Sequence, residues 1–441
     1  MSYYTSAREL SKSQLTEGRY YSVFIKDEEG LDIDVRFRFG LFEISQEKDC
    51  AILRNREKLD ILKKLDQYPS VFRLANIDKC KSDFLVLEKS LDGYFDSSKK
   101  IYIYGAHKIG AKIARASIEH GLTVSGFIDN NPAKKSPIPN IPIYNSNDVV
   151  IEDEVVVVAS GHYSNEIFWQ IADRHWPKVL NFHQFSFAIH LLSCGEDFRS
   201  YSSALYRDGN RLISAFLELD DEQSRRVFDG LIGMRASLDT KIAEKFKSPF
   251  EDEYLDSLFI FPKDIAYYVD AGAAAGDTLD RLEKRFGPVD HAYMFEPELP
   301  VYYEGLKKYS SRNNVFFYNF GLSSNYDKAV YQPVLSFDVL GEVNNSIPND
   351  ITSFIQAIKL DDIVTEKVTL FKLDIEGGEA SALLGAAKTI KKFHPKLCVC
   401  TYHRSDDLWK LLDIVKKIDN SYKVGLRHYA DIIEDSSFYF Y

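Results

Sequence analysis

The sequence predicts an α/β protein with two parallel sheets and a helical segment between them. Short β-branched runs alternate with helical periods in two stretches of the chain, and the helical period dominates the stretch between them. Alternating strands and helices form parallel sheets covered by helices. We therefore expect an amino-terminal mixed α/β region of unknown role, a first α/β domain, a helical connector and a second α/β domain, at residues 1–97, 98–185, 186–262 and 263–441.

Length, charge and hydropathy limit the classes of function. A chain of 441 residues is too long for one ordinary core. The net charge of −11 argues against a general affinity for nucleic acid or anionic lipid. No apolar run approaches the roughly 20 residues that span a bilayer, and the first residues lack the features of a signal peptide. We expect a cytoplasmic protein without a membrane span, and assembly into a homo-oligomer stays open.

The cysteines predict neither disulfides nor a zinc site. They are five in number and scattered, which favours buried free thiols in a reducing compartment. Cys398 and Cys400 lie two apart in a predicted strand and should share one face. An acidic cluster at 374–379 has oxygens that suit Mg²⁺, but no second ligand set accompanies it. The sequence therefore predicts no metal.

The first α/β domain begins with a strand, a glycine turn and a helix. The strand at 101–104 leads into Gly105, and the next strand ends at Asp129. An acidic residue at this spacing binds a ribose in Rossmann-like nucleotide sites. His107 stands where a second glycine would let a pyrophosphate approach, and its own expected role is that of a surface turn residue. A working nucleotide site and a purely structural unit both stay open.

The second α/β domain is expected to contain seven strands. Helices connect most of them, but the last two are joined by ADIIED alone. This segment is too short for a crossover helix, so the last two strands should form an antiparallel hairpin. The result is a sheet of six parallel strands and one reversed last strand. The expected strands lie at 266–272, 292–297, 315–322, 368–376, 396–403, 422–429 and 436–441.

A second glycine turn, VDAGAAAGDT, follows the first of these strands. Its small residues allow a ligand to approach the backbone closely, and the helix after it begins with residues that commonly cap helices. Glu296 follows twenty residues after the turn, at the end of the next strand, a spacing that suits a ribose contact. The candidate ligand-binding residues of this turn are Gly272, Ala273, Gly276, Asp277 and Thr278.

Carboxylates gather where the fourth strand ends. Asp374, Glu376 and Glu379 fall within six residues of the run LFKLDIEGGEASALLGA. Burying carboxylates without partners is costly, so the cluster calls for a role. Asp270, Glu296 and Asp374 each end a strand, and the carboxyl ends of parallel strands meet at one edge. We expect these three side chains to surround one site.

The ordered motifs resemble a known family. VDAGAAAGDT, FEPE and FKLDIEGGEASALLGA look like successive motifs of the FkbM family of S-adenosylmethionine-dependent methyltransferases, and the resemblance covers about 221–441. It implies the seven-stranded, Rossmann-like class I methyltransferase sheet, whose reversed last strand agrees with the predicted hairpin. Two departures stand out: Ala274 occupies a place where family members commonly carry asparagine, and Gly378 replaces the alanine of the usual VEGAE pattern.

The resemblance also implies the cofactor S-adenosylmethionine and the residues that bind it. Glu296 would bind the ribose hydroxyls, and Asp270 with the glycine turn would face the methionine portion. Asp374 would close the pocket near the amino or methyl end, and Gly321 would approach the adenine. The sulfonium, the ammonium and the ribose diol of this cofactor are groups that an acidic rim can satisfy.

Methyl transfer to a hydroxyl requires alignment and a proton acceptor. His403, at the end of the fifth strand, ranks first because an unperturbed imidazole has a pKa near neutrality. Glu376 ranks second, and Glu379 and His428 are further candidates. For Glu379 an equal alternative is that it complements the dipole of the helix it begins.

The leading hypothesis is an O-methyltransferase that acts on a hydroxyl of a sugar, nucleotide-sugar or glycan precursor. Residues 98–185 resemble the nucleotide-binding domain of PglD-type sugar acetyltransferases in the motifs FIDNNP and IPNIPIYNSND. The resemblance makes a nucleotide-sugar a candidate ligand of this domain. The alternative is an NAD-dependent oxidoreductase or epimerase built on the same unit. Against it, the turn lacks the second glycine. A non-enzymatic scaffold is a third hypothesis.

Overall fold

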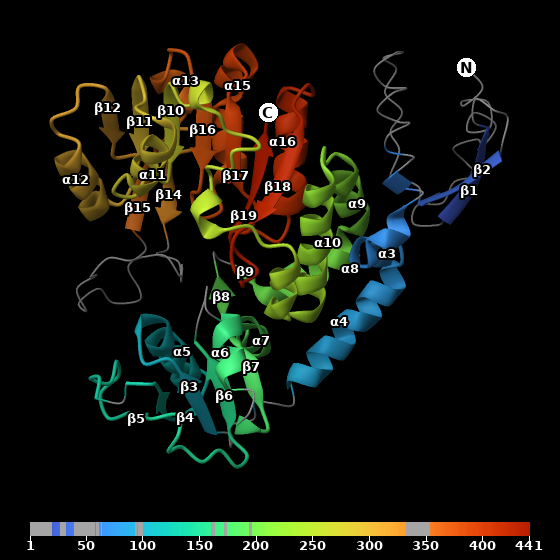
Figure 1. Cartoon of the computed structure of the whole chain (residues 1–441), viewed down its shortest axis with the longest axis vertical. Helices are drawn as coiled ribbons and strands as arrows, with labels where there is room; N and C mark the ends of the chain where they lie inside the picture. Colours follow the sequence, from blue (N-terminus) through green and yellow to red (C-terminus); the bar gives the residue numbers. More distant parts are fainter. Residues whose placement is uncertain are drawn as a thin grey trace.

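Two α/β units and a set of connecting helices make up the computed structural model of the chain (Figure 1). The two units lie at opposite ends of the view, with the connecting helices beside and between them. The structure describes residues 20–26, 32–38, 58, 61–62, 64–92, 95, 100–131, 133–159, 164–171, 174–193, 196–331 and 353–441.

The larger sheet has seven strands in the order β12-β11-β10-β16-β17-β19-β18. Six strands are parallel, and β19 is antiparallel to both of its neighbours. The predicted sheet with a reversed last strand is therefore confirmed. Strand order reverses between β10 and β16, which is where ligands bind in open α/β sheets. The strands are β10 (Tyr267–Ala271), β11 (His291–Phe295), β12 (Val315–Tyr318), β16 (Leu370–Leu373), β17 (Lys396–Cys400), β18 (Val424–His428) and β19 (Ser436–Phe440).

Helices connect these strands as the sequence predicts, and a small second sheet stands between β12 and β16. Gly321 lies in this small sheet, in β13, where it pairs with Ala357 of β15. This insertion was not predicted from the sequence. Its elements are β13 (Gly321–Leu322), β14 (Asp327–Tyr331), β15 (Ser353–Ile358) and α13 (Leu360–Ile363). The connecting helices are α11 (Asp277–Phe286), α12 (Leu299–Lys308), α14 (Glu379–Gly385), α15 (Ala387–Phe393) and α16 (Asp407–Ile418).

The smaller unit is a five-stranded sheet in the order β5-β4-β3-β6-β7, and all of its pairings are parallel. Its central strands are buried, with Val155 to Val158 fully inside. The predicted strand, turn, helix and strand are confirmed. The elements are β3 (Lys100–Tyr104), α5 (Lys108–Glu119), β4 (Thr123–Ile128), β5 (Ile143–Tyr144), β6 (Val155–Val158), α6 (Ser164–Ile171), β7 (Val179–Asn181) and α7 (Phe182–Ile189).

The connector is helical, as predicted, after a short hairpin. Within the connector, α10 (Glu222–Ser237) begins where Asp221 accepts a hydrogen bond from the Ser224 backbone. It ends at Ser237 because Leu238 adopts a left-handed backbone conformation, and a 3₁₀ turn follows. The connector elements are β8 (Leu192–Ser193), β9 (Glu196–Asp197), α8 (Phe198–Arg207), α9 (Gly209–Leu217), α10 (Glu222–Ser237), η5 (Thr240–Lys245), η6 (Phe250–Asp252) and η7 (Pro262–Asp264).

The described part of the amino-terminal region contains strands and helices. Asp32–Arg38 forms β2, which pairs antiparallel with β1. Most of the other residues before 64 lie outside the described residues. The described elements are β1 (Tyr20–Lys26), β2 (Asp32–Arg38), η3 (Leu65–Gln67), α3 (Pro69–Leu74) and α4 (Ile77–Asp92).

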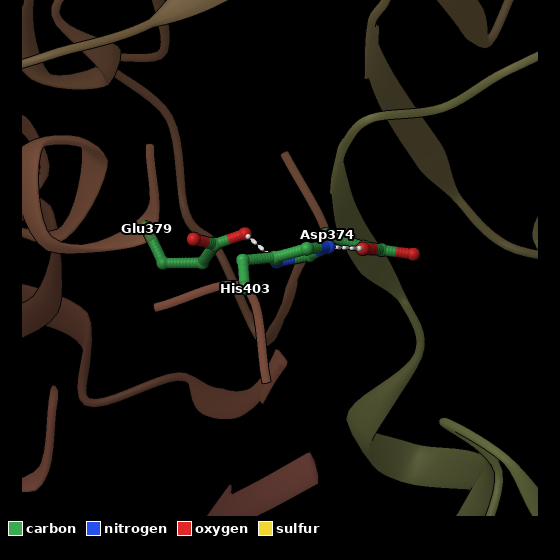
Figure 2. A group of neighbouring side chains, drawn as sticks. All are labelled: Asp374, Glu379 and His403. Atoms are coloured by element: carbon green, nitrogen blue, oxygen red, sulfur yellow. Dashed lines mark ion pairs between the residues drawn. The ribbon is translucent and has the colours of Figure 1, made fainter. Parts of the chain in front are cut away.

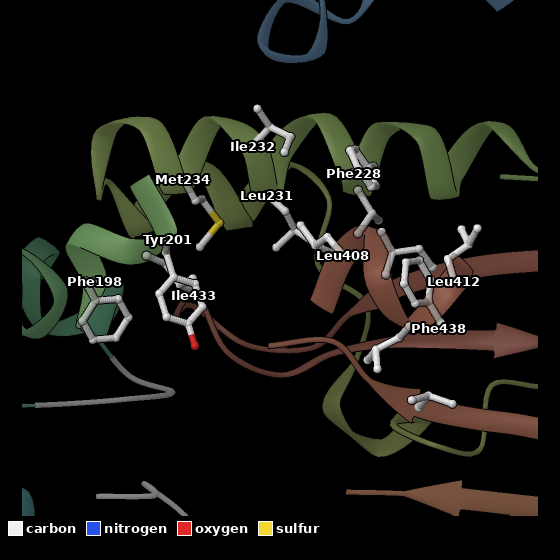
Figure 3. Packing of buried hydrophobic residues seen from close by; sticks show 14 of the residues in the cluster. Phe198, Tyr201, Phe228, Leu231, Ile232, Met234, Leu408, Leu412, Ile433 and Phe438 are labelled. Carbon is white, nitrogen blue, oxygen red and sulfur yellow. The ribbon is translucent and has the colours of Figure 1, made fainter. Parts of the chain in front are cut away.

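The connector and the larger unit share one hydrophobic core. Phe228 and Leu231 on α10 belong to the same buried cluster as Leu408 and Leu412 on α16 and Phe438 on β19 (Figure 3). Fully burying one such side chain contributes about 2 kcal/mol, so the connector is an integral part of the larger unit.

The described cysteines fit the predicted free thiols. Cys80, Cys398 and Cys400 are free and buried, and the last two both contact Tyr254. Cys50 and Cys194 lie outside the described residues. None of the helices in the described ranges is both long enough and apolar enough to cross a bilayer.

Candidate active site

The glycine turn after β10 has a backbone that few residues can adopt. Gly272, Ala274 and Gly276 have φ values of 75°, 44° and 84°. A Cβ added to Gly272 would lie 1.8 Å from the carbonyl oxygen of Asp374, so the turn packs directly on the end of β16. Left-handed backbone at a non-glycine residue costs roughly 1–2 kcal/mol. Such strain is characteristic of functional sites.

The start of α11 differs from the prediction. Gly276 is the N-cap residue and no side chain caps the helix, so capping by Asp277 or Thr278 is wrong. Asp277 is exposed in the first turn, where a carboxylate complements the helix dipole, and Thr278 is buried. The hydroxyl of Tyr309 donates to the Gly276 carbonyl at 2.7 Å and fixes the turn from outside.

Glu296 connects the end of β11 to the glycine turn. Its carboxylate accepts hydrogen bonds from the backbone N–H of Ala274 at 3.0 Å and of Glu298 at 2.8 Å. Burial raises the pKa of Glu296 to about 7, although the two N–H donors lower it. The Asn319 side chain donates to the Glu296 carbonyl at 3.0 Å. Asn319 was not among the predicted site residues.

Asp270 lies beneath the turn, not on its accessible edge. It is fully buried, accepts a hydrogen bond from the Tyr268 hydroxyl at 2.8 Å and pairs with Lys372 Nζ at 3.1 Å. Lys372 also donates to the Gly272 carbonyl at 2.8 Å. Asp270 is therefore not placed to contact a ligand directly, as was expected. It supports the turn through Lys372 instead.

Lys372 is the clearest residue that sequence reasoning missed. It is 3% exposed. Burial alone would lower the pKa of Lys372, but Asp270 and Asp374 raise it overall. A lysine is almost never fully buried unless it is paired. In the sequence, Lys372 is the one cation within the otherwise apolar strand end LFKL, and this pattern could have indicated a buried, paired lysine.

Asp374 follows β16 and faces aromatic hydroxyls. Its backbone N–H donates to Ala271 at 3.0 Å, and its carboxylate accepts from Tyr254 at 3.0 Å and Tyr402 at 3.3 Å. Burial would raise the pKa of Asp374, but Lys372, His403 and the Tyr254 hydroxyl lower it overall. Glu296, the glycine turn and Asp374 are thus joined by consecutive contacts along one edge. Asp270 supports them from below.

His403 lies between two carboxylates (Figure 2). Its Nδ1 is 2.9 Å from Glu379 and its Nε2 is 3.5 Å from Asp374. Glu379 is fully buried and accepts a hydrogen bond from the Ile375 backbone at 2.8 Å. Glu379 therefore orients the imidazole from behind and is not placed to act as an exposed base.

The carboxylates around His403 raise its pKa above the unperturbed value on which its expected role as a base rested. Burial lowers its pKa, but Glu379, Glu376 and Asp374 outweigh burial and raise it to about 10. An imidazole with this pKa holds its proton at neutral pH. His403 can accept a proton only when positive charge beside these carboxylates offsets their negative charge and lowers the pKa of His403. His428 is neutral, because burial lowers its pKa to about 4, but it is fully buried and bonded to Ser436.

Glu376 has the most accessible carboxylate of the three near His403, with 31% of its side chain exposed. It lies 3.6 Å from His403 Nε2 and has a left-handed φ of 56°. Lys112 on α5 lies near enough to interact with it. Burial and Lys108 lower the pKa of Lys112, whereas Glu376 raises it. The smaller α/β unit therefore adds a cation close to this edge.

Asp374, Glu379 and His403 can each offer one ligand atom within 4.8 Å of the others. In Figure 2, however, they lie in a row, with the imidazole between the carboxylates. Each carboxylate pairs with a different ring nitrogen. One ion would have to rearrange this row, so the geometry favours oriented proton transfer over a metal cage.

The glycine turn of the smaller unit has a similar plan. Asp129 accepts hydrogen bonds from the backbone N–H of Ala106 at 3.0 Å and Asn131 at 2.9 Å. Lys134 Nζ also pairs with it at 3.0 Å. Burial raises the pKa of Asp129, but these donors lower it overall. His107 is an exposed turn residue beside Gly105, as predicted. Nucleotide binding by this unit stays a prediction.

Comparison with known proteins identifies the larger unit. Residues 270–423 match the family model described as the methyltransferase FkbM domain, so this part of the chain is an FkbM methyltransferase domain. A crystal structure described as methyltransferase FkbM from Methylobacillus flagellatus KT is 23% identical with a TM-score of 0.64, covering 83% of this chain and 100% of that chain. This likeness shows a shared fold over most of the chain.

Other solved structures are more distant. Fibrillarin from Aeropyrum pernix, in complex with natively bound S-adenosyl-L-methionine, is 13% identical with a TM-score of 0.28, covering 41% of this chain and 69% of that chain. An rRNA methylase from Streptococcus thermophilus is 17% identical with a TM-score of 0.27, covering 43% and 89%. No curated protein matches the chain.

Proposed function

We propose that this chain, whose residues 270–423 form an FkbM methyltransferase domain, is an S-adenosylmethionine-dependent O-methyltransferase. The acceptor we infer is a hydroxyl of a sugar, nucleotide-sugar or glycan precursor. The observation that carries the proposal is the continuous edge from Glu296 through the glycine turn to Asp374 and His403.

The residues of this edge fit the cofactor. Gly272 has no side chain, and a Cβ at this position would clash with the end of β16. The missing Cβ leaves room at the turn for a ligand. The buried Glu296 carboxylate is bonded only to backbone N–H groups among the described residues, and its oxygens can accept further donors such as ribose hydroxyls. Asp374 and Glu376 place negative charge where a cationic ligand is stabilised.

The cofactor supplies an electrophilic methyl group when it is bound. Glu296 and the Gly272–Gly276 turn would hold it, and Asp374 would face its cationic end. Because positive charge beside Asp374 and Glu376 lowers the pKa of His403, His403 can then take the proton that an acceptor hydroxyl releases. Glu379 keeps the imidazole oriented during this change.

The first test is ligand binding. S-adenosylhomocysteine should raise the melting temperature of the protein, because a ligand that binds only the folded state stabilises it. NADH at the same concentration should not. A folded sample without a shift from S-adenosylhomocysteine contradicts the cofactor assignment.

The second test identifies the acceptor. Tritium transfer from methyl-labelled S-adenosylmethionine should be measured with neutral sugars, sugar phosphates, nucleotide-sugars and glycan oligosaccharides. NMR of the product should place the new methyl on oxygen. A methyl on nitrogen or carbon contradicts O-methylation. Transfer to none of these acceptor classes, from a protein that binds the cofactor, contradicts the sugar assignment.

The oxidoreductase alternative is not favoured. Asp129, the residue that would bind a ribose in the smaller unit, is bonded to two backbone N–H groups and to Lys134. Displacing Lys134 would be needed before a dinucleotide ribose could use that face of the carboxylate.

A further inference from the structure

The segment that carries His403 is bonded to the connector at both ends. It joins β17 to α16. The hydroxyl of Tyr201, on α8, donates to the Tyr402 carbonyl at 2.7 Å. Arg235, on α10, donates through Nη1 to the Ser405 carbonyl at 2.9 Å. Each donor is 2% exposed, so water does not replace either bond easily.

The two donors also contact each other. The Arg235 guanidinium lies 5.0 Å from the centre of the Tyr201 ring. Next to Tyr201, the Ser202 hydroxyl donates to the Arg235 carbonyl at 2.6 Å. At the end of α8, Arg207 donates to the Ser405 hydroxyl at 3.3 Å. The connector therefore presents a preassembled pair to the segment.

The cofactor turn has no such dependence on the connector helices. The hydrogen bonds described for Ala274, Glu296 and Lys372 all stay within residues 263–441. Tyr254, between η6 and η7 of the connector, donates a hydrogen bond to Asp374, but no hydrogen bond described for the turn comes from α8 or α10. A defect confined to α8 or α10 should therefore change the His403 side alone.

We propose that Tyr201 and Arg235 are positioning residues for His403, an inference that rests on the proton-accepting role proposed above. The peptide that joins Tyr402 to His403 is fixed by the Tyr201 hydroxyl. His403 keeps separations of 2.9 Å and 3.5 Å to its two carboxylates. Misplacement of a reacting group by about 1 Å can cost a hundredfold in rate, so the connector sets the geometry of proton transfer.

The test is Tyr201→Phe, which removes one hydroxyl and keeps the ring against Arg235. In the protein saturated with S-adenosylhomocysteine, the His403 imidazole is titrated by NMR with labelled histidine, its signal being assigned through His403→Asn. We expect its pKa to fall by at least half a unit, because the ring leaves its carboxylates. Amide exchange of residues 402–405 should rise at least tenfold, and affinity for S-adenosylhomocysteine should stay within twofold.

The matched control is Tyr206→Phe on the same helix. Its ring packs on Phe84, and its hydroxyl has no hydrogen bond to the described residues. Wild-type pKa and exchange in Tyr201→Phe, or equal changes in both variants, would overturn the proposal. If S-adenosylhomocysteine does not bind the wild type, the proposed function fails, while titration and exchange of the unliganded protein still test the positioning.

Discussion

The two glycine turns of this chain share a hydrogen-bonding plan and differ in charge. In each, an acidic residue at the end of the second strand accepts one N–H from the turn and one from two residues further along its own chain. Asp129 is also neutralised by Lys134, whereas Glu296 has no cation bonded to it among the described residues. Correspondingly, the pKa of Asp129 is lowered and that of Glu296 is raised to about 7.

The cation of the second turn lies elsewhere. Lys372 is buried under the turn and pairs with Asp270, so the carboxylate of Glu296 keeps capacity for a ligand. A glycine turn followed by an acidic residue thus predicts the backbone hydrogen bonds of the site but not whether the acid can bind a ligand. The position of the nearest lysine decides whether the acid is available for binding.

The largest expected effect separates the two lysines. Lys372→Met leaves Asp270 buried without its cation and should destabilise the protein by about 3–5 kcal/mol. Lys134→Met, at a half-exposed pair, should cost at most about 1 kcal/mol. Urea unfolding of both variants measures the difference. Similar losses would mean that the buried pair does not stabilise the second turn.

The sequence was informative about backbone pattern and less so about such partners. The alternation of strands and helices, the reversed β19 and both glycine turns follow from periodicity and spacing. Lys372, Tyr254 and Asn319 reach the site from separate places in the chain. Their contacts depend on packing, which a single sequence does not reveal.

The same limit explains the errors at the site. Asp270 ends a strand as predicted, but its side chain points to the buried face. His403 was ranked as a base from its unperturbed pKa, whereas three carboxylates from one turn raise that pKa to about 10. The motif reveals that these residues are close together. Only the fold reveals which are buried and which are paired.

The second prediction concerns the two turn glycines. Gly272→Ala places a Cβ 1.8 Å from a backbone oxygen at a φ of 75° and should cost about 2–4 kcal/mol. Gly105→Ala is also strained by a positive φ, of 120°, but its Cβ meets the movable His107 side chain at 2.6 Å and the Ala159 carbonyl oxygen only at 3.1 Å, so it should cost less. Thermal unfolding compares them. An equal or larger loss at Gly105 would show that the first turn is as constrained as the second.

The third prediction is a pH dependence specific to Glu296. Its folded pKa of about 7 exceeds the ordinary value of 4.5, so the folded state binds the proton more tightly than the unfolded state. Stability from this group is complete below about pH 4.5 and is lost as pH rises through 7, by up to about 3 kcal/mol.

Glu296→Gln should remove this dependence and weaken binding of S-adenosylhomocysteine at pH 8, where the carboxylate is ionised. Asp129→Asn is the matched control and should leave that binding unchanged. Calorimetric titration at pH 6 and 8 provides the measurement. Wild-type affinity in Glu296→Gln would refute the assigned ribose contact.

The smallest effect has opposite signs in the two turns. Ala274 donates to Glu296 from a left-handed backbone with a φ of 44°, whereas Ala106 donates to Asp129 without a positive φ. Glycine at 274 relieves strain and should stabilise the protein by up to about 1 kcal/mol. Glycine at 106 adds only chain entropy to the unfolded state and should destabilise it by about 0.5–1 kcal/mol. Denaturant midpoints of the two variants measure this. If both glycine variants destabilise the protein, the backbone at Ala274 is not strained. The proposal that the second turn stores strain would then be wrong.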